Sequence, residues 1–260
     1  MRLYFNYLLL MLKSQMQYRV SFWLLMLAQL FVPFFLFAGL YFLFERFGHI
    51  KGWDFFEVAL CFSIIHVAYT IAETFGRGFD AFSTLIVNGD FDRLLVRPRG
   101  TVVQVLGSRF EFTKIGRLLQ STAVMAWSLA VIDTDWTLLK ALTLVLMTAS
   151  CIAIFAGIFI LAATLCFWTI QGLEVINVFT DGGREMAQYP LHIYQKWVGV
   201  FFTFVIPFGC ANYYPLLYIL DKPGGIGALS MLTPLAGLAF IAPCLLVWHI
   251  GVRHYRSTGS

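Results

Sequence analysis

Residues 76–100 read GRGFDAFSTLIVNGDFDRLLVRPRG, and this charged, amphipathic stretch interrupts a chain that otherwise consists of apolar runs. Its apolar residues recur at helical spacing, at Phe79, Phe82, Leu85 and Ile86. Asn88-Gly89 breaks that helix, and Asp90 is placed to cap a second one over residues 91–96, which Pro98 ends. Two such short helices cannot cross a membrane. We therefore predict that they lie at its surface and present charged side chains to a soluble partner.

The composition is typical of a protein that crosses a membrane several times. Of the 260 residues, 60% are hydrophobic and 12% are charged, whereas about 25% are charged in soluble domains. At roughly 20 residues per span, the chain accommodates about six spans in a single domain, residues 1–260. The net charge of +4 is small and does not indicate nucleic-acid binding, because basic residues near spans follow from membrane topology.

We expect an all-α membrane protein with six transmembrane helices and an N-terminal elbow helix, residues 1–20, in the membrane interface. The expected spans cover residues 21–44, 55–75, 115–132, 138–168, 196–206 and 232–250. Several helix-breaking residues follow the fifth span, namely Pro207, Gly209, Asn212 and Pro215. This pattern predicts a broken, re-entrant segment between spans five and six, shielded by other parts of the protein.

The distribution of Lys and Arg predicts the orientation. With the N-terminus inside, the outer loops hold Arg46, Lys51, Lys140 and Lys222, which leaves 18 − 4 = 14 basic residues on the inner side. Basic residues concentrate on the cytoplasmic side of membrane proteins. We therefore expect residues 76–100, residues 171–195 and both termini to lie in the cytoplasm.

A few polar residues fall within the expected spans. Glu73 and Arg77 are four apart and predict an ion pair on one helix face, while Arg117 lies where its side chain could extend back to the membrane surface. His66, in the middle of span two, and Asn212 are candidates for a translocation path. Hydrogen bonding between neighbouring helices explains both residues equally simply.

Motifs for catalysis are scarce. The chain has no phosphate-binding G-x-x-x-x-G-K-[ST] loop, so we expect no ATP site and no catalytic residues. Its five histidines are scattered and its five cysteines sit in apolar runs, so we expect no metal site. Asp90-Phe91-Asp92 is an acidic pair of the kind that can hold a divalent ion. It leaves open an alternative function, a membrane enzyme acting on a lipid-linked substrate, beside a docking or helix-capping role.

Two motifs carry a resemblance to a known family. Residues 88–98, NGDFDRLLVRP, and residues 204–208, FVIPF, with residues 212–215, NYYP, are similar to segments of a bacterial branch of the type-2 ABC exporter permeases. The resemblance covers nearly the whole chain. It implies a subunit that moves a hydrophobic or amphipathic substrate by alternating access across the bacterial cytoplasmic (inner) membrane.

The same resemblance implies the partners. Two permeases, identical or related, would sit over two copies of a separate ATPase, which would hold the ATP and Mg²⁺, so this chain needs no cofactor of its own. Residues 76–100 would contain the coupling helix that docks on the ATPase. The residues implied in docking are Phe79, Phe82, Asp90, Phe91, Asp92, Arg93 and Arg97. Substrate identity, transport direction and the choice between identical and mixed permeases are left open.

Overall fold

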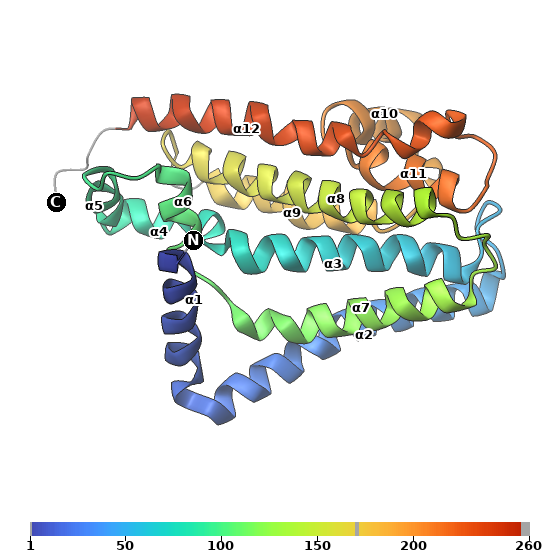
Figure 1. The fold of residues 1–260 in the computed structure, drawn as a ribbon, viewed down its shortest axis with the longest axis horizontal. Coiled ribbons are helices and arrows are strands. Elements are labelled where there is room, and N and C mark those ends of the chain that lie inside the picture. Colours follow the sequence, from blue (N-terminus) through green and yellow to red (C-terminus); the bar gives the residue numbers. More distant parts are fainter. Residues whose placement is uncertain (1, 170–171, 256–260) are drawn as a thin grey trace.

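The protein, described here by a computed structural model over residues 2–169 and 172–255, is a long bundle of helices (Figure 1). The helices along the bundle are α2 (Arg19–Phe47), α3 (Phe55–Asp80), α7 (Ile115–Val131), α8 (Leu138–Leu165), α9 (Gly172–Ala187) and α12 (Leu235–His254). Successive helices run in opposite directions, as Figure 1 shows. Over the described residues the prediction of an all-α fold is confirmed, since they contain no strand.

The bundle has two distinct ends. We call the end with α4 (Phe82–Val87), α5 (Asp90–Leu95) and α6 (Thr101–Leu106) the loop end, and the opposite end the far end (Figure 1). At the loop end α1 (Arg2–Gln15) lies across the bundle and joins α2 through a short 3-10 turn, η1 (Met16–Tyr18). Both ends of the described chain lie at the loop end, so an even number of crossings connects them.

Several helices are long and apolar enough to cross a membrane. Within the described residues they are Leu8–Phe47, Phe55–Val87, Leu138–Leu165 and Leu235–His254, with a fifth if the bent pair Lys196–Phe204 and Gly209–Ile219 is one span. α7 and α9 have 17 and 16 residues, slightly fewer than the roughly 20 of a typical span. A multi-pass membrane protein is thereby confirmed, and the number of six spans stays a prediction.

α3 is the centre of the bundle. It packs against α2, α7, α8 and α9, and its residues from Val58 to Thr70 are all buried. Such complete burial means that other helices of the chain, and not lipid, cover this part of α3. α3 begins with a capping box, in which Asp54 and Glu57 satisfy each other's backbone N–H groups.

The far end contains the predicted break. α10 (Lys196–Phe204) is followed by a π-helical turn, η4 (Gly209–Tyr213), and α11 (Tyr214–Ile219). The chain bends by 85° between the two halves of this segment, where Pro207 lacks the N–H that a continuing helix needs. A further 3-10 turn, η5 (Gly227–Met231), leads into α12.

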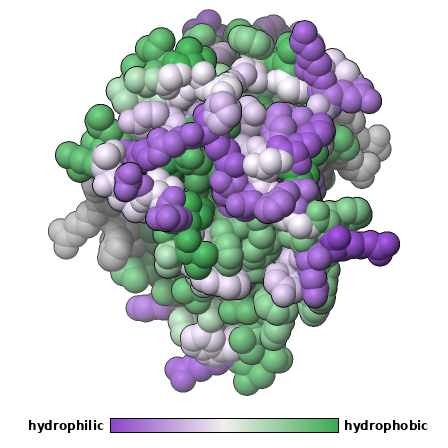
Figure 2. Space-filling model, turned by 90° about the vertical axis from the view of Figure 1, so that its right-hand side faces the viewer, coloured by the Kyte–Doolittle hydropathy of each residue, from purple (hydrophilic) through white to green (hydrophobic). Residues whose placement is uncertain are grey.

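Two lysines join the turns of the far end. The Lys222 ammonium donates to the Gly52 carbonyl at 2.7 Å and pairs with Glu57 at 2.9 Å, while it lies 5.0 Å from the ring centroid of Trp53. Lys51 donates to the carbonyls of His192 and Ile193 at 3.2 and 3.3 Å. Figure 2 looks onto this end, where hydrophilic residues gather across the middle of the face with hydrophobic ones around them.

α9 corrects one prediction. Residues 171–195 were expected to form a cytoplasmic loop, but α9 runs beside α8 from the loop end towards the far end (Figure 1). The chain after it, at His192, is bonded to Lys51 of the far end. The helix carries too many polar residues for a hydropathy criterion. It packs against α3 and α8, and several of its polar residues pair with α3 or with one another. The connection therefore passes along the bundle and does not stay at one end.

Close approach of α7 and α2 gives a stability prediction. A Cβ placed on Gly116 would lie 2.0 Å from the Met26 carbonyl oxygen, whereas one placed on Gly39 of α2 would meet nothing within 4 Å. We expect Gly116→Ala to lower the free energy of unfolding by about 1–3 kcal/mol, because the helices must separate. Gly39→Ala is the control, and its better helix propensity leaves stability equal or slightly raised. Thermal unfolding of the purified protein in detergent measures both. Equal midpoints for the two variants would contradict this packing.

Candidate functional site

The loop end is built around a cluster of aromatic rings. Phe79 ends α3, Phe82 begins α4 and Phe91 lies in α5, and all three side chains are buried. The ring centroids of Phe82 and Phe91 lie 5.0 Å apart, and those of Phe82 and Trp248 of α12 lie 5.1 Å apart. Phe167, just after α8, and Tyr255, just after α12, complete the cluster. The loop is therefore packed onto the ends of three bundle helices.

This burial revises the role expected for the three phenylalanines. Phe82 and Phe91 expose 0% of their surface, and a ring enclosed by its own chain offers no contact area to a partner. An amphipathic pattern reports that one face is covered, but it does not report what covers it. In this protein the apolar face of the loop turns inward, so any docking surface must come from the residues on its outer side.

The outer side of the loop combines exposed charges with exposed apolar residues. Arg93 and Arg97 are exposed, and the Arg93 guanidinium lies 3.3 Å from the Asp90 carboxylate. Exposed apolar side chains on the same loop are those of Val87, Leu95 and Val96. Val96 is 84% exposed, which is unfavourable for an apolar residue unless another surface covers it.

The acidic pair of the loop takes a different geometry from the expected one. Gly89, with φ of +68°, is the cap residue of α5, and Asp90 is its first helical residue, so the predicted Asp90 cap is wrong. Glycine is suited to this left-handed conformation because it has no Cβ. Residues two apart on a helix do not face each other, and Asp92 lies beside Tyr255, at the opposite end of the chain. Burial, and next the Asp92 carboxylate, raise the pKa of Tyr255.

A hydrogen bond and a close backbone approach hold the loop in place. The Trp248 indole N–H donates to the Thr101 hydroxyl at 3.0 Å, which joins α12 to α6. A Cβ on Gly78 of α3 would lie 1.8 Å from the Val105 carbonyl oxygen of α6. Only glycine permits so close an approach. Motion of the loop would therefore be passed to both α3 and α12.

Next to the loop, inside the bundle, lies a cluster of buried charges around Glu73. One Glu73 oxygen accepts from Lys114 at 2.8 Å and the other from Arg117 at 3.0 Å. The guanidinium of Arg77, the predicted partner, lies 3.9 Å from the Glu73 carboxylate. Arg77 instead donates to Glu111 at 2.9 Å and to Asp80. The i,i+4 prediction thus identified a weak contact and missed the strong ones, which come from residues distant in sequence.

Arg117 also differs from its predicted position. Its side chain does not extend to the surface but is buried between Glu73 and Gln29 of α2, whose amide oxygen accepts from it at 2.8 Å. A buried guanidinium is costly unless it is paired and hydrogen-bonded. Arg117 satisfies that condition by joining α2, α3 and α7.

The structure brings His66 and Asn212 to the same helix end. The His66 Nε2 atom lies 3.1 Å from the Gln188 amide oxygen, and its ring stacks on Phe62 at 4.0 Å. Asn212 donates to the Ala187 carbonyl and to the Cys61 sulfur, each at 3.0 Å. Both residues therefore bind the C-terminal end of α9. A path role for either one stays a prediction.

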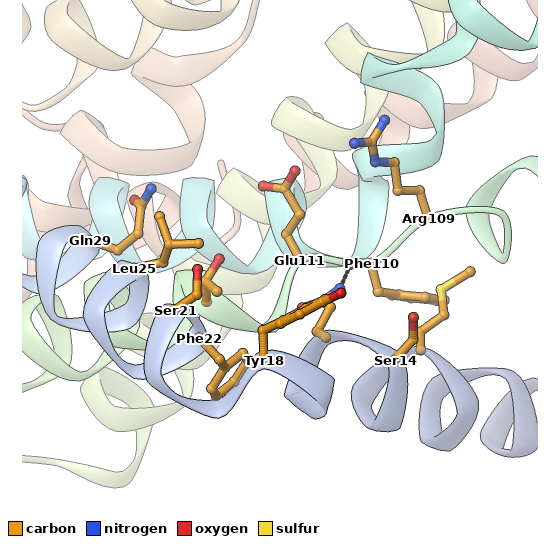
Figure 3. Close-up of a pocket in the computed structure, with 12 residues that line it drawn as sticks. Ser14, Tyr18, Ser21, Phe22, Leu25, Gln29, Arg109, Phe110 and Glu111 are labelled. Atoms are coloured by element: carbon orange, nitrogen blue, oxygen red, sulfur yellow. Dashed lines mark hydrogen bonds between the residues drawn. The ribbon is translucent and has the colours of Figure 1, made fainter.

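A second region of interest is the cleft between the α1–α2 corner and residues 109–113, shown in Figure 3. It has a volume of about 540 Å³, and Tyr18, Gln29 and Glu111 are among its lining residues. The Gln15 amide donates to the Phe110 carbonyl and accepts from the Phe112 N–H at 3.1 Å. This side chain pairs with the backbone as a neighbouring strand would, and it fixes α1 to the chain entering α7 through η2 (Phe112–Lys114).

The polar residues of α9 were not singled out in the sequence. Asp181 accepts a hydrogen bond from the Tyr69 hydroxyl at 3.2 Å, and Arg184 lies over the same ring, 4.8 Å from its centroid. Gln188 binds His66. A signal was present, because Asp181, Arg184, Glu185 and Gln188 recur at positions that share one helix face. The overall polarity of residues 171–195 nevertheless led to the prediction of a loop.

The aromatic cluster generates a stability prediction. We expect Phe91→Ala to lower the free energy of unfolding by about 3–5 kcal/mol, because it removes a fully buried ring. Val96→Ala, on the same loop but exposed, is the matched control and changes stability by less than about 0.5 kcal/mol. Thermal unfolding and limited proteolysis of the loop measure the difference. A Phe91→Ala protein as stable and as protease-resistant as the control would show that the ring is not packed in this way.

Comparison with known proteins gives one match. A family model described as ABC-2 family transporter protein matches residues 29–259. The matched part contains the loop end, the buried charge cluster and the far end. Searches of curated proteins and of solved structures each give no match.

Proposed function

Because the chain belongs to the ABC-2 family of transporter proteins, we propose that it is the membrane-spanning permease of an ATP-driven exporter. A family match over residues 29–259 is the observation that carries the proposal. It covers the loop end and the bundle from residue 29 onwards, and it agrees with the resemblance of the two sequence motifs. The energy source is a separate ATPase, and the cargo is a hydrophobic or amphipathic molecule moved by alternating access.

The docking surface for the ATPase is the outer side of the loop. Val87, Leu95 and Val96 supply apolar contact area, and Arg93 and Arg97 flank it. An exposed apolar patch with charged residues at its rim is typical of a protein interface. Of the residues implied by the resemblance, Asp90, Arg93 and Arg97 lie where they can touch a partner, with Asp92 beside Tyr255. Phe79, Phe82 and Phe91 act from inside.

The aromatic cluster is the means by which docking reaches the bundle. Its rings come from the loop, from the end of α8 and from α12, so a displacement of the loop moves all three as a packed unit. Packed interiors transmit displacement because they deform little. Two ATPase copies that close on ATP would thus rock two permeases, identical or related, against each other.

We further propose that the bundle crosses the bacterial inner membrane six times. In this topology α9 is the fifth crossing, and α10 to η5 form the broken re-entrant segment before α12. Lys196 then joins Arg46, Lys51, Lys140 and Lys222 at the far end, which leaves 18 − 5 = 13 basic residues elsewhere. The positive-inside rule still assigns the loop end and both termini to the cytoplasm.

The alternative function, an enzyme acting on a lipid-linked substrate through Asp90 and Asp92, has no observation that favours it. Asp90 is ion-paired with Arg93 at 3.3 Å, and Asp92 points towards Tyr255. In the part of the chain that the structure describes, no three His, Cys, Asp or Glu residues are grouped to hold a metal ion. The ATP and Mg²⁺ of the proposed exporter belong to the ATPase.

A substitution on the outer side of the loop tests docking. We expect Val96→Asp to remove most of the ATP hydrolysis that co-purifies with the tagged chain from native membranes, because a charge replaces an apolar contact at an interface. Ile226→Asp is the matched control, since Ile226 is an exposed apolar residue of the far end. It should retain full hydrolysis. Equal hydrolysis with both variants would show that the ATPase does not dock at Val96.

Thiol labelling tests the orientation. We expect a cysteine at Ile226 to react with a membrane-impermeant maleimide added to intact cells, and a cysteine at Val96 to react only after the membrane is opened, because the two residues lie at opposite ends of the bundle. The unsubstituted chain supplies the background, since its cysteines are buried or partly buried. Labelling of the Val96 cysteine from outside would overturn the cytoplasmic assignment of the loop end.

A further inference from the structure

A polar cavity lies inside the bundle between α3, α7 and α9. Its volume is about 310 Å³. The lining residues are Tyr69, Glu73, Arg77, Asp80, Arg117, Thr180, Asp181 and Arg184. All of them are polar, although the helices that carry them belong to a membrane-spanning bundle. Polar groups at this depth are expensive unless they serve a function.

We propose that this cavity binds the oxyanion group, phosphate or carboxylate, of an amphipathic ligand, and that Arg117 and Arg184 hold it. The assignment of that ligand as the transported cargo rests on the proposed export function. Binding itself does not depend on it.

The carboxylates of the cavity are already paired. Glu73 is held by Lys114 and Arg117, and Asp80 by Arg77. Asp181 accepts from Tyr69. With three carboxylates and three guanidinium groups the lining is formally neutral, so its total charge does not select a ligand.

The buried hydrogen-bond donors without a partner do select a ligand. Among the residues that the structure describes, the Nε atoms of Arg117 and Arg184 are buried without a hydrogen-bond partner. Both are donors, and a buried donor requires an acceptor. Both guanidinium groups also lie near the Tyr69 ring, 5.9 Å and 4.8 Å from its centroid. Guanidinium groups bind phosphate and carboxylate through paired hydrogen bonds.

Asp181 is placed to give way to the ligand. Its carboxylate lies 3.4 Å from Arg184, and its side chain is 57% exposed. By comparison, the Glu73 pairs are shorter and buried. Arg184 also pairs with Glu185, at 2.9 Å. Asp181 can therefore turn away while an incoming oxyanion takes its place beside Arg184 and the Glu185 pair is kept. The same carboxylate competes with the ligand for that site.

Exposed apolar side chains on the same helix suit an amphipathic ligand. Val178 and Phe179 are exposed on α9, one turn before Asp181. An apolar tail could lie against these side chains while the oxyanion enters among the arginines.

Binding to the purified full-length chain in detergent tests the proposal, with calorimetry as the measurement. The probes are dioctanoyl phosphatidic acid, inorganic phosphate and, as the tail without an oxyanion, dioctanoylglycerol. We expect phosphatidic acid to bind and dioctanoylglycerol not to bind. Arg184→Gln should weaken phosphatidic acid binding about tenfold or more, because it removes a charge-assisted hydrogen bond. Asp181→Asn should strengthen it several-fold, because the competitor loses its charge while the Tyr69 contact is retained.

Controls separate binding from folding. Arg46→Gln removes an exposed arginine of the far end and should leave affinity unchanged, and Arg184→Lys should give an intermediate affinity. Opposite effects at Arg184 and Asp181 are not expected from general destabilisation. If the protein binds both inorganic phosphate and phosphatidic acid, the source of the oxyanion is a soluble molecule. If it binds phosphatidic acid alone, the source is a lipid. Both results support the site.

Two results would overturn the proposal. One is equal binding of dioctanoylglycerol and phosphatidic acid, and the other is an affinity that neither Arg184→Gln nor Asp181→Asn changes. Co-purifying ATP hydrolysis, measured on the same variants, keeps the two proposals apart. If hydrolysis persists without oxyanion binding, the export function stands and the site is wrong. If oxyanion binding persists but no ATPase co-purifies, the binding site stands and the export function is wrong.

Discussion

The arrangement of this protein depends on the requirement that charges inside a membrane-spanning bundle neutralise each other. Glu73 meets it by taking Lys114 on one oxygen and Arg117 on the other. Leaving one member unpaired would cost several kcal/mol. Because Arg117 also binds Gln29, this one cluster fixes α2, α3 and α7 against each other. Arg77 extends it to Glu111 at the mouth of the cleft of Figure 3.

The loop end and the charge cluster are held by different interactions, aromatic packing in the first and ion pairs in the second. Aromatic rings at the loop end pack without direction beyond their edge-to-face preference, so they hold the loop firmly but allow it to move as one body with α12. Ion pairs within the bundle depend on distance and geometry, so they set the register of particular residues. A transporter needs both properties, since one part must be displaced while another keeps its residues in register.

How far the sequence could be read depended on whether a pattern was local. The loop helices, the break near Pro207 and α7 within a residue follow from spacing and from breakers, which act over a few positions. The partners of Glu73 were missed because Lys114 and Arg117 are forty residues away. The burial of Phe82 and Phe91 was missed because amphipathicity does not say which surface covers the apolar face. α9 was missed because its polar residues pair with α3, through Tyr69 and His66, and with one another.

α3 runs without a proline from the capping box beside Lys222 to Phe79 in the aromatic cluster. A helix of its 26 residues is about 39 Å long, and its buried course leaves it no room to flex. It therefore behaves as a stiff lever, and a tilt of about 5° at one end shifts the other by about 3 Å over that length. Such a shift exceeds the tolerance of a salt bridge. A displacement of the loop would therefore break or form the Lys222–Glu57 ion pair at the far end of the bundle.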